Sequence, residues 1–258
     1  MKNTVITTII GILLVSSSYG QKKPNIDSLV KESKKTEVWE PVPVMVSPGK
    51  SASDAPSDAI VLFNGKNLNA FQKKGGGVPG WKLDAQGILN VVKGSGDIET
   101  KEKFGSCQLH IEWRTPAAIA GDGQSRGNSG IFLMGKYELQ VLDSYNNPTY
   151  SNGQAGSIYK QYIPLVNASR KPGEWQSYDI IFNAPRFFSD GKLQQPATIT
   201  VFHNGVLVQN NVTILGSTEW IGAASYKNHA EMESLVIQDH GMDGGNPVSF
   251  RNIWIRPL

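Results

Sequence analysis

From Ala59 to its end, the chain is a succession of short apolar runs separated by turn residues. The runs are rich in Val, Ile, Leu, Phe, Tyr and Trp, and turn dipeptides such as Asn64-Gly65, Asp190-Gly191 and Asn204-Gly205 lie between them. This pattern is typical of β-strands joined by tight turns. We expect strands at Ile60–Phe63, Trp81–Asp84, Ile88–Val92, Ser106–Arg114, Gly130–Met134, Tyr137–Leu142, Trp175–Asn183, Ala197–His203, Val206–Gln209, Leu235–Gln238 and Ser249–Ile255.

Helical patterns are missing from the same sequence, because Pro or Gly interrupts every amphipathic window. Many short strands without helices between them favour antiparallel sheets over a parallel α/β arrangement. No segment repeats at a fixed period, which argues against a propeller or a solenoid. The sequence therefore predicts an all-β protein, a jelly-roll sandwich of two antiparallel sheets.

The N-terminal segment has the layout of a secretory signal. Residues 1–20 combine Lys2, an apolar run from Thr4 to Val15 and small residues before Gln21. The run is too short to span a bilayer, so we expect cleavage and export to the periplasm or cell surface. Residues 21–56 are rich in Lys, Ser, Pro and Asp and are interpreted as a linker or N-terminal extension, and residues 57–258 as the domain.

The charge of the chain limits the classes of binding partner, and its cysteine content limits the disulfide bonds that it can form. The formal net charge is +3 with no basic block, which argues against nucleic acid and anionic membranes as partners. Cys107 is the single cysteine, so no disulfide can form within the chain, and the fold depends on its apolar core.

Two predicted strands carry polar residues on one face. By the period of two, Gln108, His110 and Glu112 lie opposite the apolar residues of Ser106–Arg114. These groups could bind a sugar, or they could form an ordinary solvated face of an antiparallel sheet.

The second strand, Tyr137–Leu142, places Glu138 and Gln140 on one face, and Asp143 reaches that side only through a bulge or the strand's end. The E-x-Q-x-x-D spacing resembles the E-x-D-x-x-E of jelly-roll glucanases, in which two carboxylates flank the glycosidic bond. Gln140 replaces the middle carboxylate, so a retaining double displacement does not follow from the pattern. Glu138 is the carboxylate that we expect to act as acid or base.

Three loops add candidate groups. The glycine-rich segment Gly121–Gly130 contributes Arg126 and Asn128, and Ser144–Gln161 contributes Tyr159 and Lys160. Loops held by a rigid sandwich often carry binding residues. At a strand end, Gln238 and His240 follow one another closely, and a histidine can transfer protons near neutral pH.

Taken together, several segments resemble the 3-keto-disaccharide hydrolase domain, a family of exported bacterial proteins related in fold to concanavalin A-like lectins and glucanases. The likeness covers Ala59–Leu258, and the segments are specific as a set in this order. They are Leu62–Leu68, Gly127–Phe132, Tyr137–Asp143, Gly173–Gln176, Asn204–Val206, Gln238–Gly241 and Phe250–Arg256.

The resemblance implies cleavage of a glycoside whose C3 hydroxyl has already been oxidised to a ketone. The ketone acidifies the C2 proton, so elimination needs a base, donors to the enolate oxygen and an acid at the leaving oxygen. We interpret Glu138 as the base and His240 as acid or base on the other side. The remaining groups are donors to the enolate oxygen (Arg126, Asn128, Lys160) or orient the others (Gln140, Asp143, Gln238).

Other interpretations stay open. Direct hydrolysis, with Glu138 activating water, is the alternative within the enzyme class. Outside it stand a non-catalytic carbohydrate-binding module and an adhesion domain of the envelope, because one sandwich serves many functions. No cofactor is required, although a divalent cation ligated by His240, His110 and Glu112 is a further alternative, as is a structural Ca²⁺ at Asp239, Asp243 and Asn246.

Overall fold

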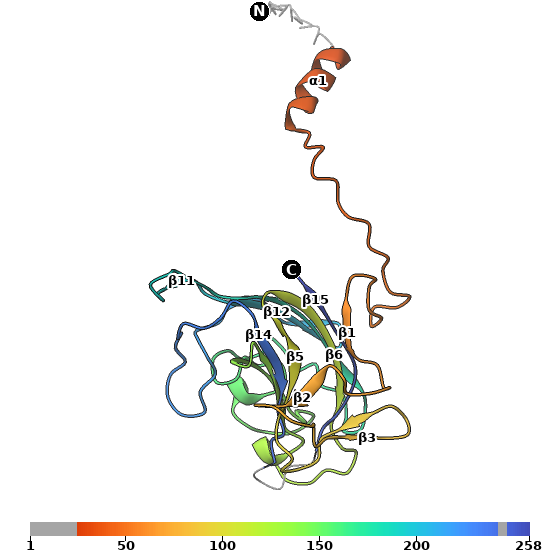
Figure 1. Ribbon diagram of the computed structural model, residues 1–258, viewed down its shortest axis with the longest axis vertical. Coiled ribbons are helices and arrows are strands. Elements are labelled where there is room, and N and C mark those ends of the chain that lie inside the picture. The colour runs from red at the N-terminus through yellow and green to blue at the C-terminus, as the bar shows by residue number, and fades with distance from the viewer. Residues whose placement is uncertain (1–24, 242–246) are drawn as a thin grey trace, which may run out of the picture. The chain divides into compact units, whose positions relative to one another are not determined.

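The computed structural model describes residues 25–241 and 247–258, and it divides into two units, of which the second comprises Val46–Leu258. The predicted signal segment lies outside the described residues and stays a prediction. The first unit contains α1 (Ile26–Ser33) (Figure 1). The helix begins after Asn25, whose side chain accepts a 3.0 Å hydrogen bond from the Asp27 N–H. A single 3-10 turn, Lys34–Thr36, follows.

This unpredicted helix lies in the segment interpreted as a linker or N-terminal extension, and the β-sandwich prediction for the domain is unchanged. Ile26, Leu29 and Val30 follow the i, i+3, i+4 spacing of an amphipathic helix, but over only eight residues, and none of the helix's residues is buried. The N-cap asparagine, with Asp27 in the first turn and Lys31 in the last, is a further sequence signal. No helix among the described residues is long and apolar enough to cross a membrane.

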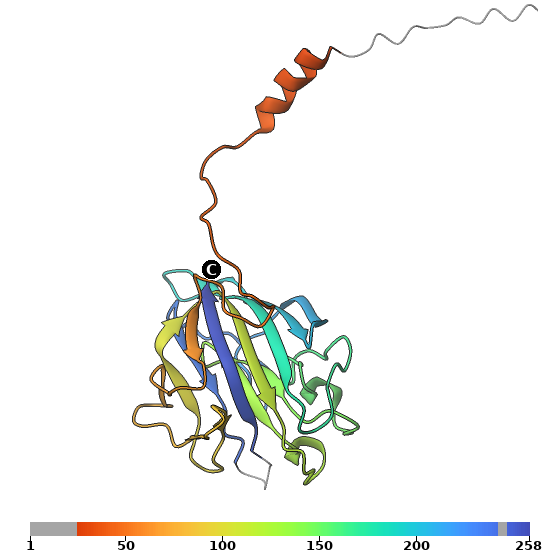
Figure 2. The same cartoon turned by 90° about the vertical axis from the view of Figure 1, so that its right-hand side faces the viewer.

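The second unit is a β-sandwich, as predicted. The larger sheet has the order β13-β12-β9-β6-β15-β4-β3, with β1 also paired to β15, and its pairs are antiparallel (Figure 2). Its strands are β1 (Ile60–Phe63), β3 (Lys82–Leu83), β4 (Leu89–Asn90), β6 (Cys107–Arg114), β9 (Gln176–Asn183), β12 (Thr198–His203), β13 (Val206–Thr213) and β15 (Ser249–Pro257).

The smaller sheet has the order β2-β5-β14-β7-β8, so β8 is an edge strand. Its strands are β2 (Phe71–Lys73), β5 (Ile98–Phe104), β7 (Ser129–Leu133), β8 (Tyr137–Val141) and β14 (Glu233–Ile237). A separate hairpin pairs β10 (Arg186–Phe187) with β11 (Leu193–Gln195).

Every predicted strand overlaps an observed one, and the short or charged strands are those that the sequence did not reveal. β5 carries three consecutive exposed charged residues, 101–103, which hide its alternation. β2, β10 and β11 have two or three residues each, too few for a period of two to be recognised.

The core lies between the two sheets and decides where the polar residues go. Leu109 and Ile111 of β6 and Leu139 and Val141 of β8 are fully buried in one apolar cluster. Because successive side chains of a strand alternate, the polar residues of β6 and β8 lie on the two opposite outer faces of the sandwich. The two polar strands of the sequence therefore do not contribute to one site.

Candidate active site

Three of the predicted site residues meet on the outer face of the smaller sheet, as the alternation of β8 predicts. Glu138 pairs with Phe132 across β7 and β8, and Gln140 pairs with Gly130. The Gln238 N–H donates to the Gly130 carbonyl at 3.0 Å, which places Gln238 in the same row, one residue past the end of β14. Glu138, Gln140 and Gln238 thus come together as expected.

Gly130 makes room for the Glu138 carboxyl. A Cβ at this position would lie 2.5 Å from Glu138 Oε1 and 2.7 Å from a ring carbon of Phe132. Both side chains therefore lean over the glycine, where a larger residue would collide with them. Glu138 is left only 6% exposed.

Burial changes the protonation of this carboxyl. Loss of solvent raises the pKa of Glu138 from 4.5 to about 8, and the negative charge of Asp97 adds to the increase. Asp97 lies just before β5, where its carboxylate accepts hydrogen bonds from the Asp239 N–H at 3.0 Å and from Lys74 Nζ at 3.2 Å. At neutral pH most Glu138 side chains are consequently protonated.

Side-chain amides surround Glu138. Gln140 Nε2 donates to Gln124 Oε1 at 3.0 Å and to Asn128 Oδ1 at 3.3 Å. With its amide turned by 180°, Gln140 instead donates to Glu138 Oε1 and to the Ser129 carbonyl, both at 3.2 Å. In either orientation, the side-chain amide of Gln140 lies next to the Glu138 carboxyl.

His240 stands at the end of this amide network. Its Nε2 lies 3.4 Å from Asn128 Nδ2, which also donates to the Gln124 carbonyl at 2.8 Å. Among the residues that the structure describes, two buried atoms of this region, His240 Nδ1 and Gln238 Oε1, have no hydrogen-bond partner. Unsatisfied buried polar atoms are costly, so they are candidates for contact with a bound molecule.

The side chains of Asp143 and Arg126 form an ion pair with each other. Arg126 Nε donates to Asp143 Oδ2 at 2.7 Å, and the guanidinium also donates to the Tyr145 carbonyl at 2.9 Å. β8 has ended at Val141, and the Asp143 N–H bonds the Gly127 carbonyl at 3.1 Å. This pair anchors the glycine-rich loop beside the site, and neither member serves as a free carboxylate or donor.

Tyr159 and Lys160 lie on the other side of Glu138. The Tyr159 N–H donates to the Glu138 carbonyl at 3.2 Å, and its hydroxyl lies 2.7 Å from that of Tyr150. Lys160 Nζ donates to the Trp220 carbonyl at 2.5 Å. The structure therefore brings Tyr159 near Glu138 but commits the Lys160 ammonium to a loop contact.

His110 and Glu112 lie elsewhere, on the outer face of the larger sheet. His110 Nδ1 is 2.6 Å from Asp179 Oδ1, and Glu112 accepts from Arg251 Nε at 2.6 Å and Asn252 Nδ2 at 2.9 Å. The ring of Trp254 stacks on His110, with centroids 5.4 Å apart. These two candidates are not brought together with Glu138.

The same cluster shows opposite pKa shifts. Burial works against the charged form of each group, but hydrogen bonds and opposite charges outweigh it. The pKa of His110 rises to about 9 through Asp179 and Glu112, and that of Glu112 falls to about 2 through His110, Asn252 and Arg251. Both groups are held in their charged forms.

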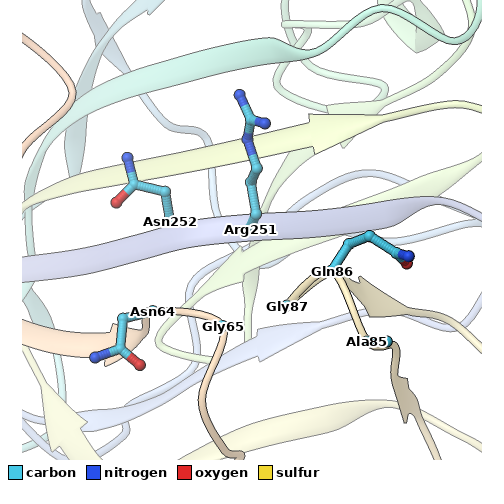
Figure 3. Close-up of a pocket in the computed structure, with 7 residues that line it drawn as sticks. All are labelled: Asn64, Gly65, Ala85, Gln86, Gly87, Arg251 and Asn252. Atoms are coloured by element: carbon cyan, nitrogen blue, oxygen red, sulfur yellow. The ribbon is translucent and has the colours of Figure 1, made fainter.

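A shallow cavity of about 470 Å³ opens beside this cluster (Figure 3). It is formed by the turn after β1, the turn between β3 and β4, and two residues of β15. Its walls are Asn64, Gly65, Ala85, Gln86, Gly87, Arg251 and Asn252. None of the residues in contact with Glu138 takes part.

Within residues 25–241 and 247–258, no group of three or more His, Cys, Asp or Glu side chains is placed to hold a metal ion. His240 follows the end of β14 in the smaller sheet, whereas His110 and Glu112 belong to β6 in the larger sheet. The three residues therefore do not form one set of metal ligands. Asp239 accepts from the Gly96 N–H at 2.9 Å, and Asp243 and Asn246 lie outside the described residues.

Sequence reasoning missed three residues of this region, Asp97, Gln124 and Trp220, whereas Tyr150 belongs to the segment Ser144–Gln161 that it proposed as a binding loop. Asp97 and Gln124 stand in glycine-rich turns, where polar residues are ordinary. Tyr150 and Trp220 come from loops whose approach to Glu138 depends on tertiary contacts. No local signal distinguishes them.

Comparison with known proteins gives a consistent picture. Residues 58–256 match the family described as 3-keto-alpha-glucoside-1,2-lyase-like domain. A structure from Parabacteroides distasonis ATCC 8503, described as a proposed glycosyl hydrolase, is 55% identical, with a TM-score of 0.83 over 87% of this chain and 96% of that one. A second from the same organism with the same description is 20% identical, with a TM-score of 0.55 over 78% and 94%, and shares the fold. No curated protein matches.

Proposed function

This chain belongs to the 3-keto-alpha-glucoside-1,2-lyase-like domain family and is a glycoside-active enzyme, and from that premise we propose that it cleaves glycosides already oxidised to a ketone at C3. The observation that carries the proposal is the Glu138 carboxyl, buried and largely protonated at neutral pH among amide donors. A site of this kind suits proton transfer at an activated sugar better than nucleophilic attack by a carboxylate.

A double displacement needs an ionised carboxylate nucleophile close to a carboxylic acid. Here Gln140 takes the middle position, and Asp143 is bound to Arg126. Asp97 is bound to Lys74 and to the Asp239 backbone. The arrangement therefore favours elimination followed by hydration.

In the proposed reaction, a base removes the C2 proton, and the electron pair of that bond moves so that an enolate forms at the C3 oxygen. As the enolate collapses, the C1–O bond breaks and the leaving oxygen takes a proton. Water then adds across the C1–C2 double bond. A proton leaves at C2 and another is delivered at the leaving group, so one base and one acid suffice.

The environment of Glu138 revises the roles assigned from sequence. Because its pKa is about 8, Glu138 is mainly a proton donor at neutral pH, so we assign it as the acid at the leaving oxygen. We assign the base to His240, which stands at the end of the amide network with its Nε2 3.4 Å from Asn128 Nδ2. Asn128, Gln140 and Gln238 donate to the enolate oxygen.

Two parts of this proposal come from the sequence. The first twenty residues favour export, so the substrate would be met in the periplasm or at the cell surface. The lectin-like fold keeps a non-catalytic carbohydrate-binding module as the second candidate, and such a module has no use for a carboxyl with a raised pKa.

The test follows leaving-group release from a glucoside and from its C3-ketone, using the purified protein and its Glu138→Gln variant. We expect release from the ketone alone, falling by about 10³-fold in the variant. With Glu138 as the acid, kcat falls as pH rises through about 8; with Glu138 as the base it rises. Sugar binding without release from either compound would favour the binding module instead.

A further inference from the structure

Beyond edge strand β8, two loops carry exposed aromatic residues on the side of Glu138 that faces away from His240. Trp220 is 74% exposed and the adjacent Ile221 76%, and Tyr150 is 40% exposed. With Tyr159, the residues Tyr150 and Trp220 form what we call the aromatic rim. Tryptophan is seldom so exposed without a partner to contact.

The rim is attached to the backbone of Glu138 itself. On the edge of β8, the Glu138 N–H donates to Thr218 Oγ1 at 3.0 Å, two residues before Trp220. The Glu138 carbonyl accepts from the Tyr159 N–H at 3.2 Å. The loops that carry Trp220 and Tyr159 are therefore fixed at the position of the candidate acid.

Lys160 joins these loops to each other. Its Nζ donates to the Trp220 carbonyl and lies 5.7 Å from the ring centre of Tyr159 and 6.0 Å from that of Tyr150. The two tyrosine hydroxyls bond each other at 2.7 Å. The two tyrosine hydroxyls and the Lys160 ammonium thus already have partners within the rim, and what it offers to a ligand is mainly ring surface, together with the indole N–H of the exposed Trp220.

The two sides of Glu138 differ accordingly. Toward His240, side-chain amides of Gln140, Asn128 and Gln238 can bind the hydroxyls and carbonyl of a sugar ring. Toward the rim, few free donors or acceptors remain, so a second sugar would lose hydrogen bonds to water there, whereas a flat apolar group would not. Glu138, a proton donor between the amide side and the rim, is therefore placed to protonate the oxygen of a bond that joins a sugar ring to a flat apolar group.

We propose that the aromatic rim is the subsite for the leaving group, that Trp220 determines specificity, and that the preferred leaving group is a planar aromatic alcohol. This inference rests on the proposed function, because it assumes a bond to be cleaved at Glu138. The substrate class is then the aryl glycosides oxidised at C3.

The experiment compares kcat/KM for the phenyl and methyl glucosides oxidised at C3, and for an oxidised disaccharide, in wild type and Trp220→Ala. We expect the variant to lose about tenfold on the phenyl compound and less than about twofold on the methyl compound. Trp220→Phe should retain most of the phenyl activity. Phe188→Ala removes another exposed aromatic side chain, 53% exposed on the β10–β11 connection, and should change neither.

An equal loss on the phenyl and methyl compounds, or a loss confined to the disaccharide, would overturn the inference. If wild type releases nothing from any ketone, the proposed function fails separately. In that case, calorimetric binding of the unoxidised phenyl and methyl glucosides tests whether the rim binds an aromatic group. Tighter binding of the phenyl compound that disappears in Trp220→Ala supports the inference, and equal binding of the two compounds refutes it.

Discussion

The two outer faces of the sandwich carry strands of the same design with opposite electrostatics. β6 presents Glu112 with His110, and β8 presents Glu138 with Gln140, each opposite a fully buried apolar face. Yet the pKa of Glu112 falls to about 2 and that of Glu138 rises to about 8. The two carboxyls are in opposite protonation states at neutral pH.

Partners account for the difference. Glu112 has Arg251, Asn252 and His110 around it, so its charge is compensated, and such clusters hold a sheet surface together. Glu138 has an amide and a nearby negative charge, and its burial is left uncompensated. A group kept at a cost in stability is a better candidate for chemistry than one that is fully paired.

The largest expected effect is a difference in kcat between variants that replace a carboxyl on each of the two outer faces. Glu138→Gln should lower kcat on a C3-oxidised glucoside by about 10³-fold, because the replacement cannot transfer a proton. Glu112→Gln changes the same kind of group on the other face and should leave kcat within about twofold. Steady-state release of the leaving group measures both, and comparable losses in the two variants would contradict the assignment.

A smaller loss is expected when the carboxyl is displaced instead of replaced. In Gly130→Ala the new Cβ would lie 2.5 Å from Glu138 Oε1, so the side chain must move. Misplacement of a catalytic group costs on the order of 10- to 100-fold in kcat.

The matched control is the double variant. Gly130→Ala should add nothing to the loss already caused by Glu138→Gln, since both act through the same carboxyl. Additive losses would show that the alanine disturbs the sheet by another route.

How much of this could be predicted from sequence differs between the faces. Alternation along Tyr137–Leu142 was enough to place Glu138 and Gln140 together, and the apolar runs were enough to predict two antiparallel sheets. Alternation along Ser106–Arg114 looked the same, but the partners of its polar residues come from strands far away in the sequence: Asp179 on β9 pairs with His110, and Arg251 on β15 pairs with Glu112. Whether the polar groups on a face have hydrogen-bond and charge partners depends on neighbouring strands, and these partners cannot be identified from the sequence of one strand.

The free energy of unfolding should change in opposite directions when the titrating residue is replaced on each of the two faces. The pKa of Glu138 is raised on folding, so the folded chain becomes less stable relative to the unfolded one as pH rises from 4.5 to about 8. Glu138→Gln removes this effect and should raise the free energy of unfolding at pH 8 by on the order of 2 kcal/mol. Urea denaturation at pH 5 and 8 measures it.

His110 provides the contrast. Its raised pKa contributes stability that is complete below about 6.5 and disappears as pH rises through about 9. His110→Gln should cost about 1 kcal/mol at pH 6, a modest value because the exposed Asp179 is partly screened by solvent. The cost should shrink toward pH 9, and a cost that grows with pH would contradict the ion-pair explanation.

The smallest expected effect tests how much the charge of Asp97 contributes to the raised pKa of Glu138. Asp97 adds to the raised pKa of Glu138 after burial, so Asp97→Asn should shift the alkaline limb of the kcat profile downward by less than about one pH unit. Asp179→Asn alters a carboxylate on the opposite face and should leave the limb in place. If Asp97→Asn lowers kcat at every pH without moving the limb, Asp97 acts through its bonds to Lys74 and the Asp239 backbone, and burial alone sets the protonation of Glu138.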